Sequence, residues 1–330
     1  ARPREELMAH IFAAVALLAA TSAHAGGAPE TGYPQRPVRL IVGQAPGGAT
    51  DLVMRAFAKR MSDELGQTIV VDNRAGAGGI IGAALVATAP PDGYTLLAGT
   101  NGPIAISPHV TPGLQYDPAK DFAPVALYSE VPFVVVAHPS VKATNVRELI
   151  ALAKSQPGKL HFGSSGQAGT PHLCMELFKH LAGIDIVHVA YKGGAPAQVD
   201  LMAGRVELYC AGLPSLAPPI KSGKIRPIAV AAQKRLPAMP NVPTGAEEGL
   251  RGFDVNAWNG VLAPAKTPKS VIARLHAATV AVMKSPEFVA ELRTRGAEPL
   301  LLGPSEFSQY IRRESEKWAK VVKAGKVTSE

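Results

Sequence analysis

The chain has 330 residues, of which 47% are hydrophobic and 18% are charged, a composition that excludes an intrinsically disordered chain. Its 32 glycines and 29 prolines follow no period, which excludes collagen, and its length suggests two domains. The net charge of +8 comes from basic residues spread along the sequence without any nucleic-acid-binding motif, so we expect soluble anions and not nucleic acid as partners.

The first residues have the pattern of an export signal. Arg2 and Arg4 precede an apolar run over residues 11–20, and Ala23-His24-Ala25 supplies an A-x-A cleavage site. The apolar run is shorter than the roughly 20 residues that span a bilayer, and a buried N-terminal helix is the alternative. The pattern predicts a signal peptide over residues 1–25, cleaved after Ala25, and an exported protein.

The next part of the sequence predicts strands and helices in alternation. Strands are expected at 38–42, 69–71 and 95–98, and helices at 50–65 and from the 76–79 loop to about residue 88. Apolar residues recur every four positions in the first of these helices, which is typical of a helix packed on a core. A repeated strand–loop–helix order predicts a parallel sheet with helices on its faces.

The same alternation recurs further along and is followed by a helical tail. Strands are expected at 133–137, 160–162, 186–189, 206–209 and 225–231, and helices at 145–154, 170–181, 197–202, 271–283, 287–295 and 305–323. The last helix has one apolar face, so we expect it to pack on the body of the protein.

This order of elements predicts an α/β protein of two domains, each a mostly parallel sheet flanked by helices. The chain is expected to cross between them near 128–131 and to return near 254–258. Residues 26–129 and 254–330 would then form domain 1, and residues 130–253 domain 2.

Two cysteines leave one question open. An exported protein can pair Cys174 with Cys210, but two buried free thiols are equally compatible with the sequence. Only the geometry decides between these alternatives. No C-x-x-C is present, so a redox or zinc motif has no support.

The motifs of common enzymes are each incomplete. Residues 76–81 lack the last glycine of G-x-G-x-x-G, and residues 163–167 have glutamine where a nucleophile elbow needs glycine. A phosphate-binding G-K-[ST] and the metal-binding H-E-x-x-H are absent from the sequence. We therefore expect no catalytic residue, no metal and no cofactor, and a protein that is not an enzyme.

Loops rich in Gly, Ser and Thr lie between strands and the helices that follow them. Residues 46–50 and 164–170 are the main examples, and residues 99–102 and 192–194 are further candidates. Such loops present backbone N–H groups at helix N-termini, where the helix dipole favours an anion. Ordinary turns are the alternative, but two such loops on two domains predict a carboxylate site in the cleft between them.

Two polar residues near these loops have ambiguous roles. Asp51 lies in the first turn of a helix, where an acidic side chain stabilises the dipole, or it contacts an ammonium group or ordered water. His172 donates to a ligand, or it packs or caps its own helix.

Several longer motifs occur together and in a fixed order. They are Tyr33–Asp51 with P-G-G-A-T-D, Val71–Gly79, Pro91–Leu97, Lys159-Leu160 with Gly163–His172, Tyr191–Pro196, Asp200–Gly204, Asn241–Thr244 and Ala263-Pro264. Over residues 33–325 the sequence resembles the Bug (TctC-type) family of periplasmic solute-binding receptors, which serve tripartite tricarboxylate transporters.

The resemblance implies a periplasmic-binding-protein (Venus-flytrap) fold that captures a small carboxylate between two domains and delivers it to membrane permease subunits. It implies a periplasmic protein, which we expect to be a monomer. Carried over by position, the ligand-binding residues are Gln44, Pro46, Gly47, Gly48, Ala49, Thr50, Asp51, Thr100, Asn101, Ser164, Ser165, Gly166, Gln167, Gly169, Thr170, His172 and Lys192.

One departure from the family pattern concerns the cleft. Many relatives have an aspartate after a phenylalanine where this sequence has Tyr209-Cys210, which puts a cleft contact near that strand in doubt. Gln44 and Gln167 occupy variable positions and are expected to tune the choice of ligand.

Two other classes of function share these features. An exported enzyme acting on a carboxylate or ester needs a nucleophile–base pair, which the sequence does not reveal. A ligand sensor for a membrane-bound kinase would share the cleft and differ only in its partner.

Overall fold

The computed structural model describes residues 32–44, 46–47 and 49–328, with residue 49 described by its backbone only. The predicted signal peptide, its cleavage site and Gly48 lie outside the described residues. The chain divides into two compact units, residues 1–35 and residues 36–330. Every described helix and strand belongs to the second unit. None of its described helices combines the length and the apolar character that a membrane span needs.

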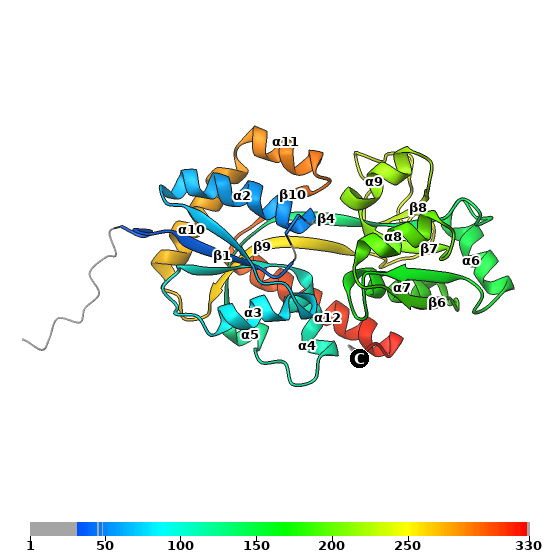
Figure 1. The fold of residues 1–330 in the computed structure, drawn as a ribbon, viewed down its shortest axis with the longest axis horizontal. Helices are drawn as coiled ribbons and strands as arrows, with labels where there is room; N and C mark the ends of the chain where they lie inside the picture. The colour runs from blue at the N-terminus through cyan, green and yellow to red at the C-terminus, as the bar shows by residue number, and fades with distance from the viewer. Residues whose placement is uncertain (1–31, 45, 48, 329–330) are drawn as a thin grey trace, which may run out of the picture. The chain divides into compact units, whose positions relative to one another are not determined.

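The unit alternates strands and helices along most of its length (Figure 1). The strands are β1 Val38–Val42, β2 Ile69–Asn73, β3 Thr95–Gly99, β4 Phe122–Ala137, β5 His161–Ser164, β6 Val187–Ala190, β7 Leu208–Gly212, β8 Arg226–Ala231, β9 Asn256–Pro264 and β10 Glu298–Leu302. The helices are α2 Ala49–Leu65, η1 Ala77–Gly79, α3 Ile80–Ala87, η2 Gly102–Ile106, α4 Ser107–Val110, α5 Pro118–Asp121, α6 Val146–Ser155, α7 Thr170–Ala182, α8 Gly194–Met202, α9 Leu213–Lys221, α10 Lys269–Met283, α11 Pro286–Thr294 and α12 Pro304–Gly325. The predicted elements are present, and most of their ends agree within about three residues. The exception is the strand predicted at 133–137, which is the last part of β4 and begins eleven residues earlier, at Phe122.

The strands form one sheet in the order β2-β1-β3-β9-β4-β7-β5-β6, with β8 and β10 also paired to β4. Pairing is parallel from β2 through β1 to β3 and from β7 through β5 to β6. It is antiparallel wherever β4 or β9 takes part. The α/β class is confirmed, and the sheet is mixed because these two long strands join its two parallel parts.

Strand β4 changes partners within its own length. Residues 122–132 pair with β9, whereas residues 133–137 pair with β7 and β8. Strand β9 returns beside β4 and starts at Asn256, opposite Pro132. These positions lie close to the two crossings expected from the sequence, and the division into two domains stays a prediction.

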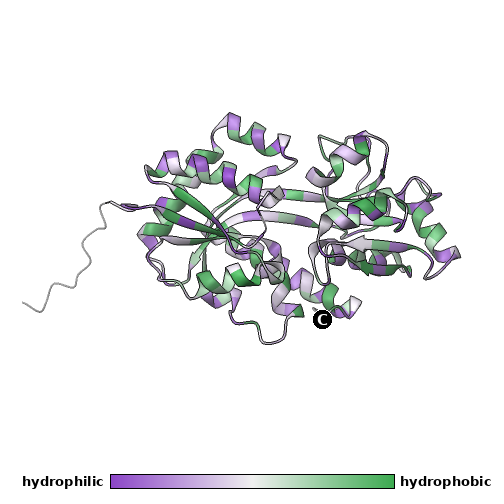
Figure 2. Ribbon diagram, viewed as in Figure 1, coloured by the Kyte–Doolittle hydropathy of each residue, from purple (hydrophilic) through white to green (hydrophobic). Residues whose placement is uncertain are grey.

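Separate hydrophobic clusters lie on the two parts of the sheet. One surrounds Trp258 and includes Phe307, whose ring meets the indole edge-on at 5.3 Å. Another surrounds Trp318 and includes Phe162 and Phe178. Helix α12 contributes to both clusters, and Figure 2 shows hydrophobic and hydrophilic residues alternating along the helices, as expected for helices with one buried face.

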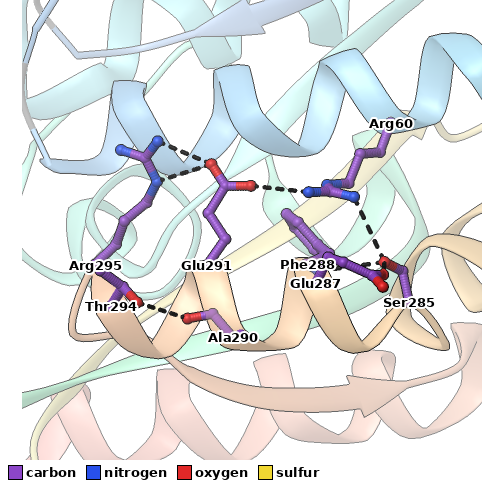
Figure 3. Close-up of polar contacts among 8 residues, drawn as sticks. All are labelled: Arg60, Ser285, Glu287, Phe288, Ala290, Glu291, Thr294 and Arg295. Atoms are coloured by element: carbon purple, nitrogen blue, oxygen red, sulfur yellow. Dashed lines mark hydrogen bonds and ion pairs between the residues drawn. The ribbon is translucent and has the colours of Figure 1, made fainter.

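Helix α11 fixes the position of α2, which follows the first predicted binding loop. The Arg60 guanidinium of α2 donates to Glu291 Oε2 at 3.2 Å and lies over the Phe288 ring at 5.3 Å (Figure 3). Arg295 donates to the other oxygen of Glu291 at 2.9 Å, so one carboxylate joins two arginines. Because Arg60 and Glu291 are partly buried, the pairing orients α2 against its neighbour.

A disulfide links α7 to β7. Cys174 and Cys210 are bonded, with their Cα atoms 6.2 Å apart, and both are buried within the Trp318 cluster. The structure therefore contains the paired alternative that the sequence left open. Helix α7 follows the second predicted binding loop, residues 164–170, so the disulfide anchors the helix next to this loop.

Candidate ligand-binding site

A cavity of about 630 Å³ opens where several strands end and helices begin. Gln44 follows β1, Thr100 and Asn101 follow β3, and Ser165 follows β5. The carboxyl ends of parallel strands are the usual place for a ligand in an α/β sheet. The predicted site residues that line the cavity are Gln44, Thr50, Thr100, Asn101, Ser165, Gln167, Gly169 and Thr170.

Helix N-termini surround this cavity and lack side-chain caps. The N-caps of α3, η2 and α7 are Gly79, Asn101 and Gly169, and none of them makes a side-chain capping hydrogen bond. In α3 the Ile80 N–H donates to the Ala77 carbonyl of the preceding turn. The first turn of α2 contributes Thr50. Uncapped N–H groups and the positive ends of helix dipoles favour an anion or water in this space.

The described residues that line the cavity carry no formal charge. Its polar groups are amides, hydroxyls and backbone, and the remaining lining residues are apolar. Among the polar groups, the Gln44 side chain donates to Thr100 Oγ1 at 3.3 Å, while its own oxygen is buried without a partner. A buried acceptor without a partner is costly, and rotation of the Gln44 amide would exchange the positions of its oxygen and its NH₂ group.

Asp51 organises the first loop and does not line the cavity. Its carboxylate accepts hydrogen bonds from the Gly47 N–H at 2.9 Å, from Arg55 Nε at 2.9 Å and from Asn73 Nδ2 at 2.8 Å. Asn73 also donates to the Gln44 carbonyl at 3.0 Å, so the network holds both sides of the loop. Burial alone would raise the pKa of Asp51, but the three hydrogen bonds outweigh it and hold the pKa below its usual range. These contacts point to a third role, that of holding the loop in position, which the sequence analysis did not include.

Replacing Asp51 by Ala is expected to lower the free energy of unfolding by about 1–3 kcal/mol, because the Gly47 and Asn73 donors lose their acceptor. Binding of a ligand in the cavity should weaken as well, since the loop loses its anchor. Urea unfolding and calorimetric titration measure the two effects. Asp63→Ala, at an exposed position of the same helix, is the matched control and should change neither.

The second predicted binding loop, residues 164–170, is held by backbone hydrogen bonds to the residues that follow β6. The Tyr191 N–H donates to the Ser164 carbonyl at 3.1 Å, and the Gly193 N–H donates to the Ser165 carbonyl at 3.2 Å. The Ser164 hydroxyl donates to the Gly166 carbonyl at 2.9 Å and accepts from the Gly166 N–H at 3.2 Å. Lys192 lies among these residues after β6, where it is exposed and does not line the cavity.

Two stacked histidines lie beneath this loop. The rings of His172 and His188 are 3.6 Å apart and nearly parallel. His172 Nδ1 accepts from the Ala168 N–H at 3.1 Å, and His188 Nε2 lies 2.6 Å from the Ser164 hydroxyl. His172 is therefore a support of the loop in this structure, and the pair of Ser164 and His188 is a contact that sequence reasoning missed.

The histidine pair predicts acid sensitivity. Burial, and the neighbouring His172 after it, lower the pKa of His188 to about 4. An unfolded histidine has a pKa of about 6.5, so the unfolded chain binds the proton more tightly between these values. The stability due to neutral His188 is complete above pH 6.5 and is lost as the pH falls toward 4.

Between pH 7.5 and pH 5, this linkage should lower the free energy of unfolding by about 1–2 kcal/mol. Urea unfolding of the wild type and of His188→Gln at the two pH values measures it, because glutamine keeps a polar group but does not titrate. An equal pH effect in both proteins would assign the acid sensitivity to other groups.

Asn101 joins the two parts of the sheet across the cavity. Its amide nitrogen donates to Thr170 Oγ1 at 3.2 Å and to the Asn256 carbonyl at 3.1 Å. Asn101 follows β3, Thr170 starts α7 and Asn256 starts β9. The buried Asn101 side chain therefore links the start of α7 to the part of the sheet that contains β3 and β9.

Sequence reasoning recognised the 76–79 loop as a loop but did not place it in the site. Ala77 and Gly78 line the cavity, and a Cβ on Gly43 would lie 2.8 Å from the Gly79 Cα. Two backbones therefore touch where β1 ends and α3 begins. The sequence did contain a signal for this contact, because the 76–79 turn is rich in glycine and follows a strand. The predicted binding loops at 46–50 and 164–170 have the same features.

Other predicted residues lie outside the cavity lining. Pro46 and Gly47 are exposed, Ser164 is buried, and Gly166 shapes its loop with a φ of 138°. Gly48 and the side chain of Ala49 lie outside the described part of the chain. The predicted ligand contacts stay predictions for all seventeen positions.

Comparison with known families identifies the protein class. The profile of the family described as "Tripartite tricarboxylate transporter family receptor" (TctC) matches residues 53–327. The chain belongs to this family. The receptor is 35% identical over 317 residues to the protein BugT of Bordetella pertussis, covering 96% of this chain and 97% of BugT.

Solved structures resemble the receptor over most of its length. An R. palustris protein with adipate has a TM-score of 0.82 and 39% identity, covering 90% of this chain and 99% of that one. MatC from Rhodopseudomonas palustris with bound malate has a TM-score of 0.77 and 33% identity, covering 88% and 100%. The periplasmic binding protein BugD has a TM-score of 0.79 and 35% identity, covering 90% and 99%. The fold is that of periplasmic solute-binding proteins.

Proposed function

We propose that the receptor captures a small carboxylate in the cavity between the 43–50 and 165–170 loops and passes it to the membrane permease subunits of a tripartite tricarboxylate transporter. The observation that carries the proposal is the cavity itself. Uncapped helix N-termini converge on it, and no charged side chain of its described lining competes with or replaces them. Such a site stabilises a carboxylate through backbone N–H groups and helix dipoles.

The comparisons support the class of ligand. Adipate and malate are carboxylates, and they are present in two of the similar solved structures. We further propose that the receptor works in the periplasm as a monomer, exported by the signal peptide over residues 1–25. Ligand contacts from both parts of the sheet would favour a closed arrangement over an open one.

We propose binding without catalysis. Ser164 and His188 are close enough to act as a nucleophile and a base, but the serine is fully buried and neither residue lines the cavity. A ligand in the cavity therefore does not reach the serine hydroxyl in this arrangement. The exported enzyme is the weaker hypothesis for this reason.

The test is a binding measurement on the mature chain from Gly26, unfolded and refolded to remove any copurified ligand. Adipate, malate and citrate are titrated, with adipamide as an uncharged analogue of adipate. A ligand at 100 times its Kd adds about 2.7 kcal/mol of stability, which is a shift of several degrees in Tm. A shift with a carboxylate but not with adipamide is expected. Equal responses to adipate and adipamide, or no response to any acid, would contradict the proposal.

A further inference from the structure

The turn after helix α11 packs directly against the start of helix α9. Gly296, in this turn, has a φ of +70°. A Cβ placed on Gly296 would lie 2.9 Å from Pro214 Cγ, 3.1 Å from Pro214 Cδ and 3.2 Å from the Pro214 nitrogen. Atoms of a proline ring and of the backbone do not swing aside as the end of a long side chain does. Position 296 therefore accepts only glycine while α9 keeps its place.

The contact joins helices that are held by different parts of the sheet. Helix α11 is bound to α2 by the ion pair of Glu291 and Arg60, and α2 packs on β1 and β2. Helix α9 belongs to the other part, because Leu213 and Leu216 lie in a further hydrophobic cluster with Val136 of β4. In the domain division predicted from the sequence, the two helices belong to different domains.

The contact also lies on the face of the sheet that carries the ligand cavity. Gly212, the N-cap of α9, pairs with Phe133 of β4, and Phe133 lines the ligand cavity. Paired residues of neighbouring strands share one face of a sheet. In α2, Thr50 lines the ligand cavity, and the nearby Leu52 lines a cavity of about 530 Å³ together with both residues of the contact. A movement of the two parts that opens the ligand cavity would therefore also separate α11 from α9.

We propose that Gly296 and Pro214 form a closing contact, which is made only when the ligand cavity is closed and which sets ligand affinity without touching the ligand. The inference rests on the proposed function and concerns the same site. If only the closed arrangement holds the ligand from both sides, the apparent Kd equals the intrinsic Kd divided by the closed fraction. A side chain that pushes α9 away lowers this fraction and weakens every ligand by the same factor.

Gly296 also ends α11, and this role alone favours glycine. The Gly296 N–H donates to the Arg293 carbonyl at 2.8 Å, and the Ala297 N–H donates to the Leu292 carbonyl at 2.9 Å, which is the Schellman pattern. Gly66 provides the matched control, because it follows the end of α2 with a φ of +69°. Apart from its own helix and its chain neighbours, no described residue comes within 4 Å of a Cβ placed on Gly66.

The experiment compares Gly296→Ala and Gly66→Ala with the wild type by calorimetric titration with adipate, malate and citrate. Both variants should lower Tm by a similar amount, because both place alanine at a positive φ. For each acid that the wild type binds, Gly296→Ala should raise the Kd at least about tenfold, by the same factor for every acid. Gly66→Ala should change the Kd by less than about twofold, because its new methyl group has no contact across the cleft.

A second substitution tests whether Pro214 transmits the effect. Pro214→Ala removes Cγ and Cδ, the two atoms that a Cβ at position 296 would approach most closely. Alone it should change the Kd by about twofold at most, and combined with Gly296→Ala it should restore the Kd to within about threefold of the wild type. Such a rescue supports the closing contact, because a defect confined to the α11 turn would persist in the double variant.

The outcomes separate this inference from the proposed function. Unchanged affinity in Gly296→Ala, equal weakening by Gly66→Ala, or weakening without rescue by Pro214→Ala would overturn the closing contact and leave the carboxylate receptor standing. Different factors for different acids would also overturn it, since Gly296 would then act on the ligand itself. Binding of adipamide as tightly as adipate contradicts the proposed function, and the four proteins then test the closing contact with adipamide as the probe.

Discussion

Replacing Gly169 by Asp is expected to leave the receptor folded and to weaken carboxylate binding by more than a hundredfold. Gly169 is the N-cap of α7, has extended backbone angles and has no side chain to accept from the first turn. An added Cβ would make only ordinary contacts, at 3.5 Å or more. Aspartate is a preferred N-cap residue, so the helix itself should tolerate or favour the change.

The same aspartate places a negative charge on the lining of the cavity. Two negative charges about 5 Å apart repel by about 3 kcal/mol at an effective dielectric constant near 20, which exceeds a factor of a hundred in Kd. Gly169→Asn is the control, because asparagine has the same shape and caps a helix equally well but is neutral. Titration of both variants with adipate isolates the charge, and equal affinities would remove α7 from the proposed site.

Removal of the disulfide should have the largest effect on stability. Cys174 and Cys210 are 36 positions apart in the sequence. Closing a loop of this length lowers the entropy of the unfolded chain, which corresponds to about 4 kcal/mol of stabilisation. The double variant with Ala at both positions should lose about this much free energy of unfolding. Urea unfolding of the wild type, the wild type with dithiothreitol and the variant measures the loss.

The crosslink should affect binding less than folding. Neither cysteine lines the cavity, and the 164–170 loop keeps its own hydrogen bonds to the chain after β6. The variant, kept at a temperature where it is folded, should therefore bind adipate within a few-fold of the wild type. A variant as stable as the wild type would show that the thiols are not paired in the protein as isolated.

The α/β class and most elements follow from local patterns, because apolar runs and glycine-rich turns specify a strand or helix directly. The local patterns did not predict the strands β9 and β10 or the first part of β4. They contain Pro124, Glu130, Asn259, Gly260 and Pro299, and their register shifts interrupt the alternation of polar and apolar residues. Pairing with a strand more than a hundred residues away stabilises them, and a local pattern does not contain that information.

The loops of the site were predictable and the roles of their side chains were not. Polarity and position between a strand and a helix identify the 43–50 and 164–170 loops, but they do not reveal that Asp51 and His172 point into hydrogen-bond networks behind the loops. The apolar part of the cavity lining was not predictable for a different reason. In sequence, Ile106, Val110 and Phe133 look like ordinary core residues, and only the fold shows that one side of their cluster borders a cavity.

The two tryptophans of the chain lie in different hydrophobic clusters, and each is fully buried. Intrinsic fluorescence therefore reports on the two clusters separately once one indole is replaced. In Trp258→Phe the emission comes from the Trp318 cluster beneath the second loop, and in Trp318→Phe it comes from the cluster that holds β1 and β3. Coincident red shifts during denaturation would indicate a single cooperative unit, whereas separate midpoints would resolve two domains that melt independently.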